Sequence, residues 1–226
     1  MSTKFRHVSS ECQFEDLTVE ESGSGARVYN APNGHKYPSV TTVTGFKKQE
    51  FFKKWRQQNP KEAKRVLARG TTFHKLVEDY LNNEECLSEG IRPDVWMMFE
   101  QAKPMLENID NIHAQEVPLW SETLELAGRV DCIAEYNGKL SVIDFKGSTR
   151  EKRASDIDNY FMQATAYAIM YHERTGIPID NIVILISTEE GTNQVFESSP
   201  LKHTKQLYDH IQDYKEYLLK ELRMYR

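Results

Sequence analysis

The sequence has few cysteines, and none of them has the paired spacing that metal clusters use. Its 226 residues contain three, Cys12, Cys86 and Cys132. An odd number without a CxxC pair argues against a disulfide framework, a zinc ribbon and an iron–sulfur cluster. We therefore expect a protein of a reducing, intracellular compartment.

The sequence also lacks long apolar runs and an excess of positive charge. No stretch approaches the roughly 20 apolar residues of a transmembrane helix, so we expect no membrane association. The N-terminal segment has neither an apolar stretch nor the acid-poor composition of a transit peptide, although a mitochondrial matrix location stays open. Lys and Arg number 29 against 34 Asp and Glu, a net charge of −5. Any DNA binding must therefore come from a local basic patch.

The patterns that are present predict a single α/β domain over residues 1–226. No repeat, low-complexity tract or Pro/Ser-rich linker divides the chain. Hydrophobic periodicity separates helices from strands along the whole sequence. The expected elements are a hairpin over 27–40, helices over 51–82 with a candidate break at Gly70, a helix over 93–105, strands over 113–120, 124–136 and 139–146, a helix over 157–171, a strand over 182–187 and a C-terminal helix over 201–222.

One predicted hairpin carries the residues that point to chemistry. Asn137-Gly138 is a strong signal for a two-residue type I′ turn between two strands. Counting outward from that turn places Asp131 directly opposite Asp144, and Lys146 returns to the same face. Facing carboxylates are destabilising unless a cation lies between them, and hard oxygen ligands suit Mg²⁺ or Mn²⁺. The hairpin therefore predicts a divalent metal site.

A structural ion network is the alternative for the same residues. In that interpretation Asp131 and Asp144 pair with Arg129 or Lys146 and bind no metal. The apolar residues beside both acids are typical of interior sheet, where unpaired charge is costly, and this favours phosphodiester hydrolysis at a metal. The metal would activate water, while Lys146 would position the nucleophile or stabilise the developing charge.

The hairpin resembles the signature of the PD-(D/E)xK nuclease superfamily. That signature is an acid followed, one strand later, by an acid, any residue and a lysine; here these are Asp131 and Asp144-Phe145-Lys146. The resemblance implies a restriction-endonuclease-like central mixed β-sheet flanked by helices, and dependence on Mg²⁺ or Mn²⁺. It implies that Asp131, Asp144 and Lys146 are catalytic, that both acids and the Phe145 carbonyl are metal ligands, and that His74 supports the metal.

Two further motifs resemble the RecB-type exonuclease branch and related phage exonucleases. Gly70 to His74 is similar to the branch's G-x-x-x-H helix, and Gln163 to Tyr167 is similar to its Q-x-x-x-Y helix. Both occur in the expected order, and the motif-bearing core covers about residues 27–188. The resemblance implies cleavage of DNA from an end.

Several of these residues also have ordinary structural explanations. His74 lies at the edge of an apolar stripe, where a hydrogen-bonded edge histidine is common. Gln163 and Tyr167, at i and i+4, share one helix face and could bind a phosphate, or they could simply lie in a buried helix. We expect both to contact DNA or to order the catalytic strand from the neighbouring helix. Glu116 could add a carboxylate, but no turn sets its pairing register.

A basic stripe on one predicted helix face offers a path for DNA. Lys64 and Arg65 are its expected DNA contacts. A solvated surface is the alternative, with a second path around 150–153. The full stripe consists of Lys61, Lys64, Arg65 and Arg69.

Taken together, the sequence predicts a metal-dependent DNA exonuclease that acts on single-stranded or frayed ends. The alternatives are a structure-selective endonuclease and a non-catalytic DNA-binding module on a nuclease fold. Expected partners are DNA with free ends and a helicase or a replication, recombination or repair protein.

Overall fold

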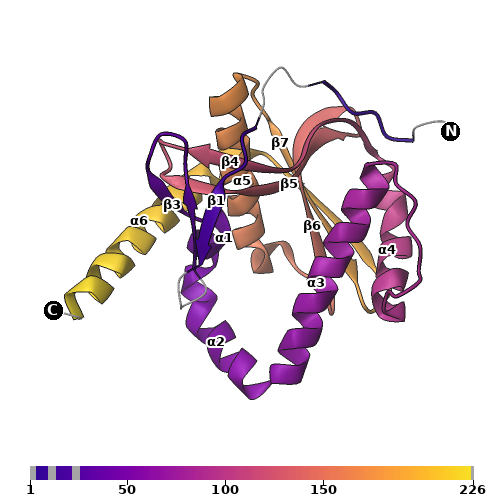
Figure 1. The fold of residues 1–226 in the computed structure, drawn as a ribbon, viewed down its shortest axis with the longest axis horizontal. Coiled ribbons are helices and arrows are strands. Elements are labelled where there is room, and N and C mark those ends of the chain that lie inside the picture. The colour runs from indigo at the N-terminus through magenta and orange to yellow at the C-terminus, as the bar shows by residue number, and fades with distance from the viewer. Residues whose placement is uncertain (1–3, 10–13, 22–25, 225–226) are drawn as a thin grey trace.

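The computed structural model describes residues 4–9, 14–21 and 26–224 (Figure 1). Cys12 lies outside these ranges, and Cys86 and Cys132 are free thiols. The elements are β1 (Thr18–Glu21), β2 (Arg27–Asn30), β3 (Lys36–Pro38), α1 (Val40–Gly45), a 3₁₀ turn (Phe46–Lys48), α2 (Gln49–Gln58), α3 (Pro60–Leu81), α4 (Pro93–Leu106), β4 (Ile109–Ser121), β5 (Leu126–Tyr136), β6 (Lys139–Ser148), a 3₁₀ turn (Ala154–Asp156), α5 (Asp158–Thr175), β7 (Asn181–Thr188), β8 (Asn193–Ser198) and α6 (Pro200–Met224).

The central element is a five-stranded mixed sheet in the order β4-β5-β6-β7-β8. Neighbouring strands are antiparallel except β6 and β7, which are parallel. A parallel pair needs a crossover connection, and α5 supplies it between β6 and β7. The short strands β1, β2 and β3 form a separate three-stranded sheet. The expected α/β class with a helix-flanked mixed sheet is confirmed.

Helices cover both faces of the large sheet, because its side chains alternate between two apolar clusters. Cys132 and Ile143 belong to the cluster under α3 and α4. Their neighbours Ile133 and Val142 belong to the cluster under α1, α5 and α6. By the same alternation, residues 131 and 144 project toward the face that α5 covers.

The fold differs from the expected elements at several places, and α1 is a short helix that was not expected. Gly70 does not break the helix, since α3 runs through it without interruption; a helical Gly costs about 1 kcal/mol, which packing of the surrounding turns offsets. Strands β1 and β8 were not expected; both are short and largely polar, so their apolar pattern is weak.

No helix within the described ranges is long and apolar enough to cross a membrane.

Strands β5 and β6 separate at the two acids. Asn137 and Gly138 both have positive φ, 50° and 76°, as the type I′ turn requires. The ladder from this turn ends at Cys132–Ile143, one pair before Asp131 and Asp144. The expected direct pairing is therefore corrected: beyond this point β5 stays paired only with β4, and β6 only with β7. Facing like charges disfavour a continued ladder, and the fork opens beside the carboxylates.

Candidate active site

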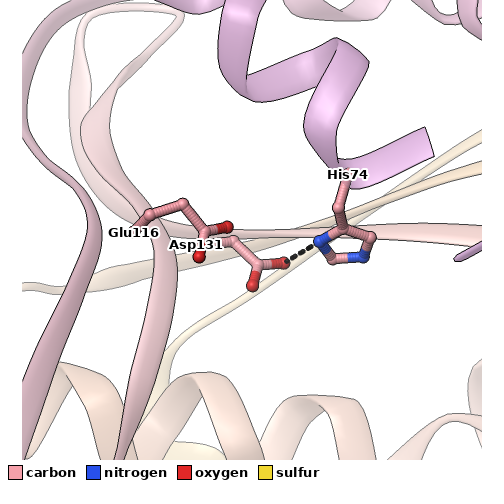
Figure 2. A group of neighbouring side chains, drawn as sticks. All are labelled: His74, Glu116 and Asp131. Atoms are coloured by element: carbon pink, nitrogen blue, oxygen red, sulfur yellow. Dashed lines mark ion pairs between the residues drawn. The ribbon is translucent and has the colours of Figure 1, made fainter. Parts of the chain in front are cut away.

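Three ligand-bearing side chains from three elements meet at the fork (Figure 2). His74 of α3, Glu116 of β4 and Asp131 of β5 each offer a ligand atom, and these atoms lie within 4.8 Å of one another. His74 Nδ1 is 3.6 Å from Asp131 Oδ2. The same Asp131 oxygen accepts the Phe145 N–H at 3.0 Å, and His74 is within hydrogen-bonding reach of the Phe145 backbone.

Asp144 lies beside this group and is 2% exposed. Its Oδ1 accepts from Lys146 Nζ at 2.6 Å and from Gln163 Nε2 at 3.2 Å. Its Oδ2 is buried and has no hydrogen-bond partner among the described residues. Strand β6 therefore brings Asp144 and Lys146 to one face, as expected, and α5 supplies the amide that orients the carboxylate.

The charges of these groups depend on their burial and on each other. Burial raises the pKa of Asp144, an effect that the Lys146 ammonium partly offsets. Burial alone would lower the pKa of Lys146, but Asp144 and Asp131 raise it above its ordinary value. Burial lowers the pKa of His74, against the opposing effect of Asp131. Lys146 is therefore an ammonium at neutral pH, while His74 is neutral.

The donor set fits a divalent metal. Glu116 and Asp131 offer carboxylate oxygens, the ligands that Mg²⁺ and Mn²⁺ prefer, and the Asp144 carboxylate lies close enough to interact with Asp131. A metal contact of Asp144 or of the Phe145 carbonyl stays a prediction. The unpartnered Oδ2 of Asp144 is a buried polar atom that only a missing cation or donor would satisfy. A structural ion network would leave this oxygen unsatisfied.

Comparison with known proteins decides the family. A model of the PD-(D/E)XK nuclease superfamily matches residues 46–224. The chain belongs to this superfamily. It is also 30% identical to the mouse (Mus musculus) mitochondrial genome maintenance exonuclease 1 over 173 residues, which is 69% of this chain and 51% of that protein. The human (Homo sapiens) protein of the same name is 32% identical over 174 residues, 69% and 50% of the two chains. The chain spans about half the length of both relatives.

The sequence left open whether Glu116 adds a carboxylate to the site of this PD-(D/E)XK chain. The structure places Glu116 beside His74 and Asp131. The pairs Gln115–Cys132 and Val117–Val130 place it opposite Asp131, and its positive φ of 49° interrupts the ladder there. Burial, together with Asp131 and Glu78, raises the pKa of Glu116 to about 7. The place of this acid inside a long predicted strand was the available signal, because a buried unpaired charge is costly.

The raised pKa of Glu116 predicts a pH-dependent loss of stability in metal-free protein. The folded state binds the proton more tightly than the unfolded state, so stability falls as pH rises from about 4.5 to about 7. Glu116→Gln should remove this loss and raise the melting temperature at pH 8 in EDTA by roughly 2–4 °C, or about 1 kcal/mol after allowance for solvent screening.

Melting curves across pH, with the exposed Glu122→Gln as control, measure this effect. At pH 4 the Glu116→Gln and wild-type proteins should melt alike. A difference that does not change with pH would contradict the assignment.

Gln163 and Tyr167 lie together at the base of the cleft that contains the metal-ligand group, which has a volume of about 520 Å³. Both side chains are largely buried, and Gln163 contacts Asp144 directly. The Tyr167 hydroxyl lies over Gly128 of β5, at a point where an added Cβ would be 2.6 Å away. Contact of either residue with DNA stays a prediction.

Two of the four cations in the expected basic stripe on α3, Arg65 and Arg69, are paired with carboxylates. Arg65 pairs with Glu62 and Glu189, both at 2.7 Å, and the buried Arg69 also pairs with Glu189. Lys64 is exposed and forms no ion pair with a described residue. Of the two predicted DNA contacts, only Lys64 therefore presents an unpaired charge, and the role of Arg65 in DNA binding stays a prediction.

Proposed function

We propose that this chain is a Mg²⁺- or Mn²⁺-dependent deoxyribonuclease that hydrolyses phosphodiester bonds. The observation that carries the proposal is the buried Asp144, which lies directly beside the Lys146 ammonium and whose Oδ2 has no hydrogen-bond partner among the described residues. A divalent cation would satisfy the carboxylate, and a phosphate oxygen would satisfy the ammonium. The superfamily and the exonuclease name of both relatives support the same chemistry.

The residues at the fork have separate roles in this proposal. Asp131, Asp144 and the Phe145 carbonyl would hold the metal, with His74 and Glu116 beside it. The bound metal supplies an activated water and neutralises charge on the phosphate. Lys146 remains protonated, so it stabilises negative charge developing on the phosphate and does not accept a proton.

Clefts adjoining the site on two sides suggest the path of the DNA. One cleft of about 470 Å³ shares Arg27 and Thr41 with the site cleft and continues along α2 to Phe52 and Arg56. Another, of about 420 Å³, shares His74 and Lys146 with it and continues along α3. We call these three clefts together the groove. Figure 1 shows α2 and α3 as the two arms of a V below the sheet in this view.

A single strand fits this groove better than an intact duplex. Asp144 is almost fully buried, so the scissile phosphate must approach the base of the groove. The groove offers the exposed aromatic Phe52 for base stacking and cations for phosphates, a combination typical of single-strand binding. Its cations are Arg27, Arg56, Arg69, Lys75, Arg129 and Lys146. Among the described residues, all of these except Arg27 and Arg56 form an ion pair with a carboxylate. We therefore propose an exonuclease that acts on single-stranded or frayed ends.

An endonuclease is the second candidate, because the groove continues on both sides of the site. One assay separates the two activities: incubation with linear single-stranded, circular single-stranded, blunt duplex and end-blocked DNA, in Mg²⁺, Mn²⁺ or EDTA. Degradation of linear single strands alone supports the exonuclease. Cleavage of the circle supports the endonuclease, and no cleavage under any condition contradicts both.

DNA binding should depend on the groove more than on the net charge. Arg56 forms no ion pair with another described residue, so Arg56→Glu should weaken binding of a single-stranded oligonucleotide and lower the salt dependence of log K by about 1. Lys64→Glu tests the remaining α3 contact in the same way. The rate at saturating DNA should change much less, because neither residue contacts the metal ligands.

Fluorescence anisotropy over a range of salt concentrations measures both variants. The control is Lys205→Glu on α6, an equal charge change at a residue that lines none of the three clefts. If Arg56→Glu binds DNA with wild-type affinity and salt dependence, α2 is not part of the DNA path. If Lys64→Glu does so, the α3 surface is a solvated face.

Partners and location follow from the same proposal. DNA with free ends is the proposed partner, and a helicase or a replication or recombination protein stays a prediction. The relatives' name refers to mitochondria, and we propose an intracellular location, mitochondrial or cytoplasmic, that imaging of the tagged protein would resolve.

A further inference from the structure

A buried arginine lies directly behind the active site. Arg69 of α3 is 3% exposed. Its guanidinium pairs with the carboxylate of Glu189, donates to Thr149 Oγ1 at 3.1 Å and reaches the Gly147 carbonyl at 3.4 Å. The planar guanidinium group of arginine carries several N–H donors, so it can make these contacts at the same time.

Glu189, in the turn after β7, reaches the same segment from the other side. Its backbone N–H donates to the Ser148 carbonyl at 2.9 Å. The Arg69–Glu189 pair therefore bonds to three successive residues, Gly147, Ser148 and Thr149, which directly follow Lys146. The segment is also tightly packed, since a Cβ on Gly147 would lie 3.2 Å from the Met98 side chain.

The same helix carries His74, five residues beyond Arg69. His74 and Lys146 both line the site cleft and the neighbouring cleft along α3. Through the Arg69–Glu189 pair, the helix that carries His74 is bonded to the strand end that carries Lys146. A buried ion pair is weak evidence for stability, because desolvation opposes the attraction between the charges. The contacts that this pair makes to residues 147–149 are therefore more informative about its role.

We propose that Arg69 and Glu189 are positioning residues for the hydrolysis, and that they set the separation of His74 and Lys146 across the cleft. The inference rests on the proposed nuclease function. Neither residue contacts the metal-ligand group, so their effect passes through the backbone of Gly147 to Thr149. A misplacement of about 1 Å at reacting groups can lower a rate about 100-fold.

Two variants and one matched control test the proposal. Arg69→Lys keeps a positive charge opposite Glu189 but lacks the guanidinium group that reaches both Gly147 and Thr149. Glu189→Gln neutralises the acid. The control is Asp94→Asn, which makes the same carboxylate-to-amide change in the same network. Among the described residues, Asp94 forms ion pairs only with Arg65 and Arg92.

Single-turnover and steady-state cleavage of a labelled single-stranded oligonucleotide in Mn²⁺ give kcat and KM. In Arg69→Lys and Glu189→Gln we expect kcat to fall about 10- to 100-fold with little change in KM, while Asp94→Asn keeps wild-type kcat. Hydrogen exchange at residues 147–149 should accelerate in the first two variants alone. If one variant fails to fold, the other carries the test.

The outcomes separate the two proposals. Wild-type kcat in folded Arg69→Lys and Glu189→Gln overturns the positioning role, and so does an equal loss in Asp94→Asn, which would mean a general effect of the network. An inactive wild-type protein contradicts the nuclease proposal instead. Even if the wild-type protein is inactive, unchanged hydrogen exchange at residues 147–149 in both variants would overturn the positioning role.

Discussion

Asp144→Asn should lower DNA cleavage by about 10³-fold or more while the protein remains folded. The amide keeps the shape of the side chain but removes the charge that would hold a cation at the unpartnered Oδ2. We expect the same loss of DNA cleavage in Asp131→Asn. Lys146→Ala should also abolish cleavage, because the ammonium beside Asp144 is lost.

Single-turnover cleavage of a labelled oligonucleotide in Mg²⁺ and in Mn²⁺ measures these losses, with Asp180→Asn as a control at an exposed acid. Calorimetric titration with Mn²⁺ gives a second readout, in which Asp144→Asn should bind more weakly and Lys146→Ala should not. Digestion at the wild-type rate by Asp144→Asn would mean that the catalytic metal lies elsewhere.

Gly128→Ala should lower the proposed nuclease activity, although it changes no acidic or basic residue. The added Cβ would lie 2.6 Å from the Tyr167 hydroxyl and 3.1 Å from its ring. Tyr167 is buried on α5, four residues after Gln163, so its displacement also moves the helix face that orients Asp144. We expect a loss of about 1–3 kcal/mol in stability and a 10- to 100-fold lower kcat.

A second substitution at Tyr167 tests this explanation. Tyr167→Phe removes the nearest clashing atom, so the double variant Gly128→Ala/Tyr167→Phe should regain part of both losses relative to Gly128→Ala. Chemical denaturation and steady-state kinetics measure the cycle, with Tyr167→Phe alone as reference. Additive losses would show that the two residues act independently.

Local chemistry was sufficient to predict much of the hairpin that carries Asp131 and Asp144. Asn137-Gly138 determined the turn, and the turn determined the pairing of the strands as far as Cys132 and Ile143. Because strand side chains alternate, Lys146 had to return to the face of Asp144. These inferences rest on neighbours in the chain, so no tertiary contact was needed to reach them.

Other features depended on contacts between distant segments. The register of β4 against β5, which brings Glu116 to Asp131, has no short turn to specify it. Glu189 lies 120 residues after Arg69, and only the packed structure shows that it pairs with Arg65 and Arg69 of the basic stripe on α3. The sequence alone thus determined the acids, the lysine and their hairpin. The tertiary structure decided where the sheet forks and which charges remain unpaired, because both depend on how α3, β4 and the β7–β8 turn pack around the site.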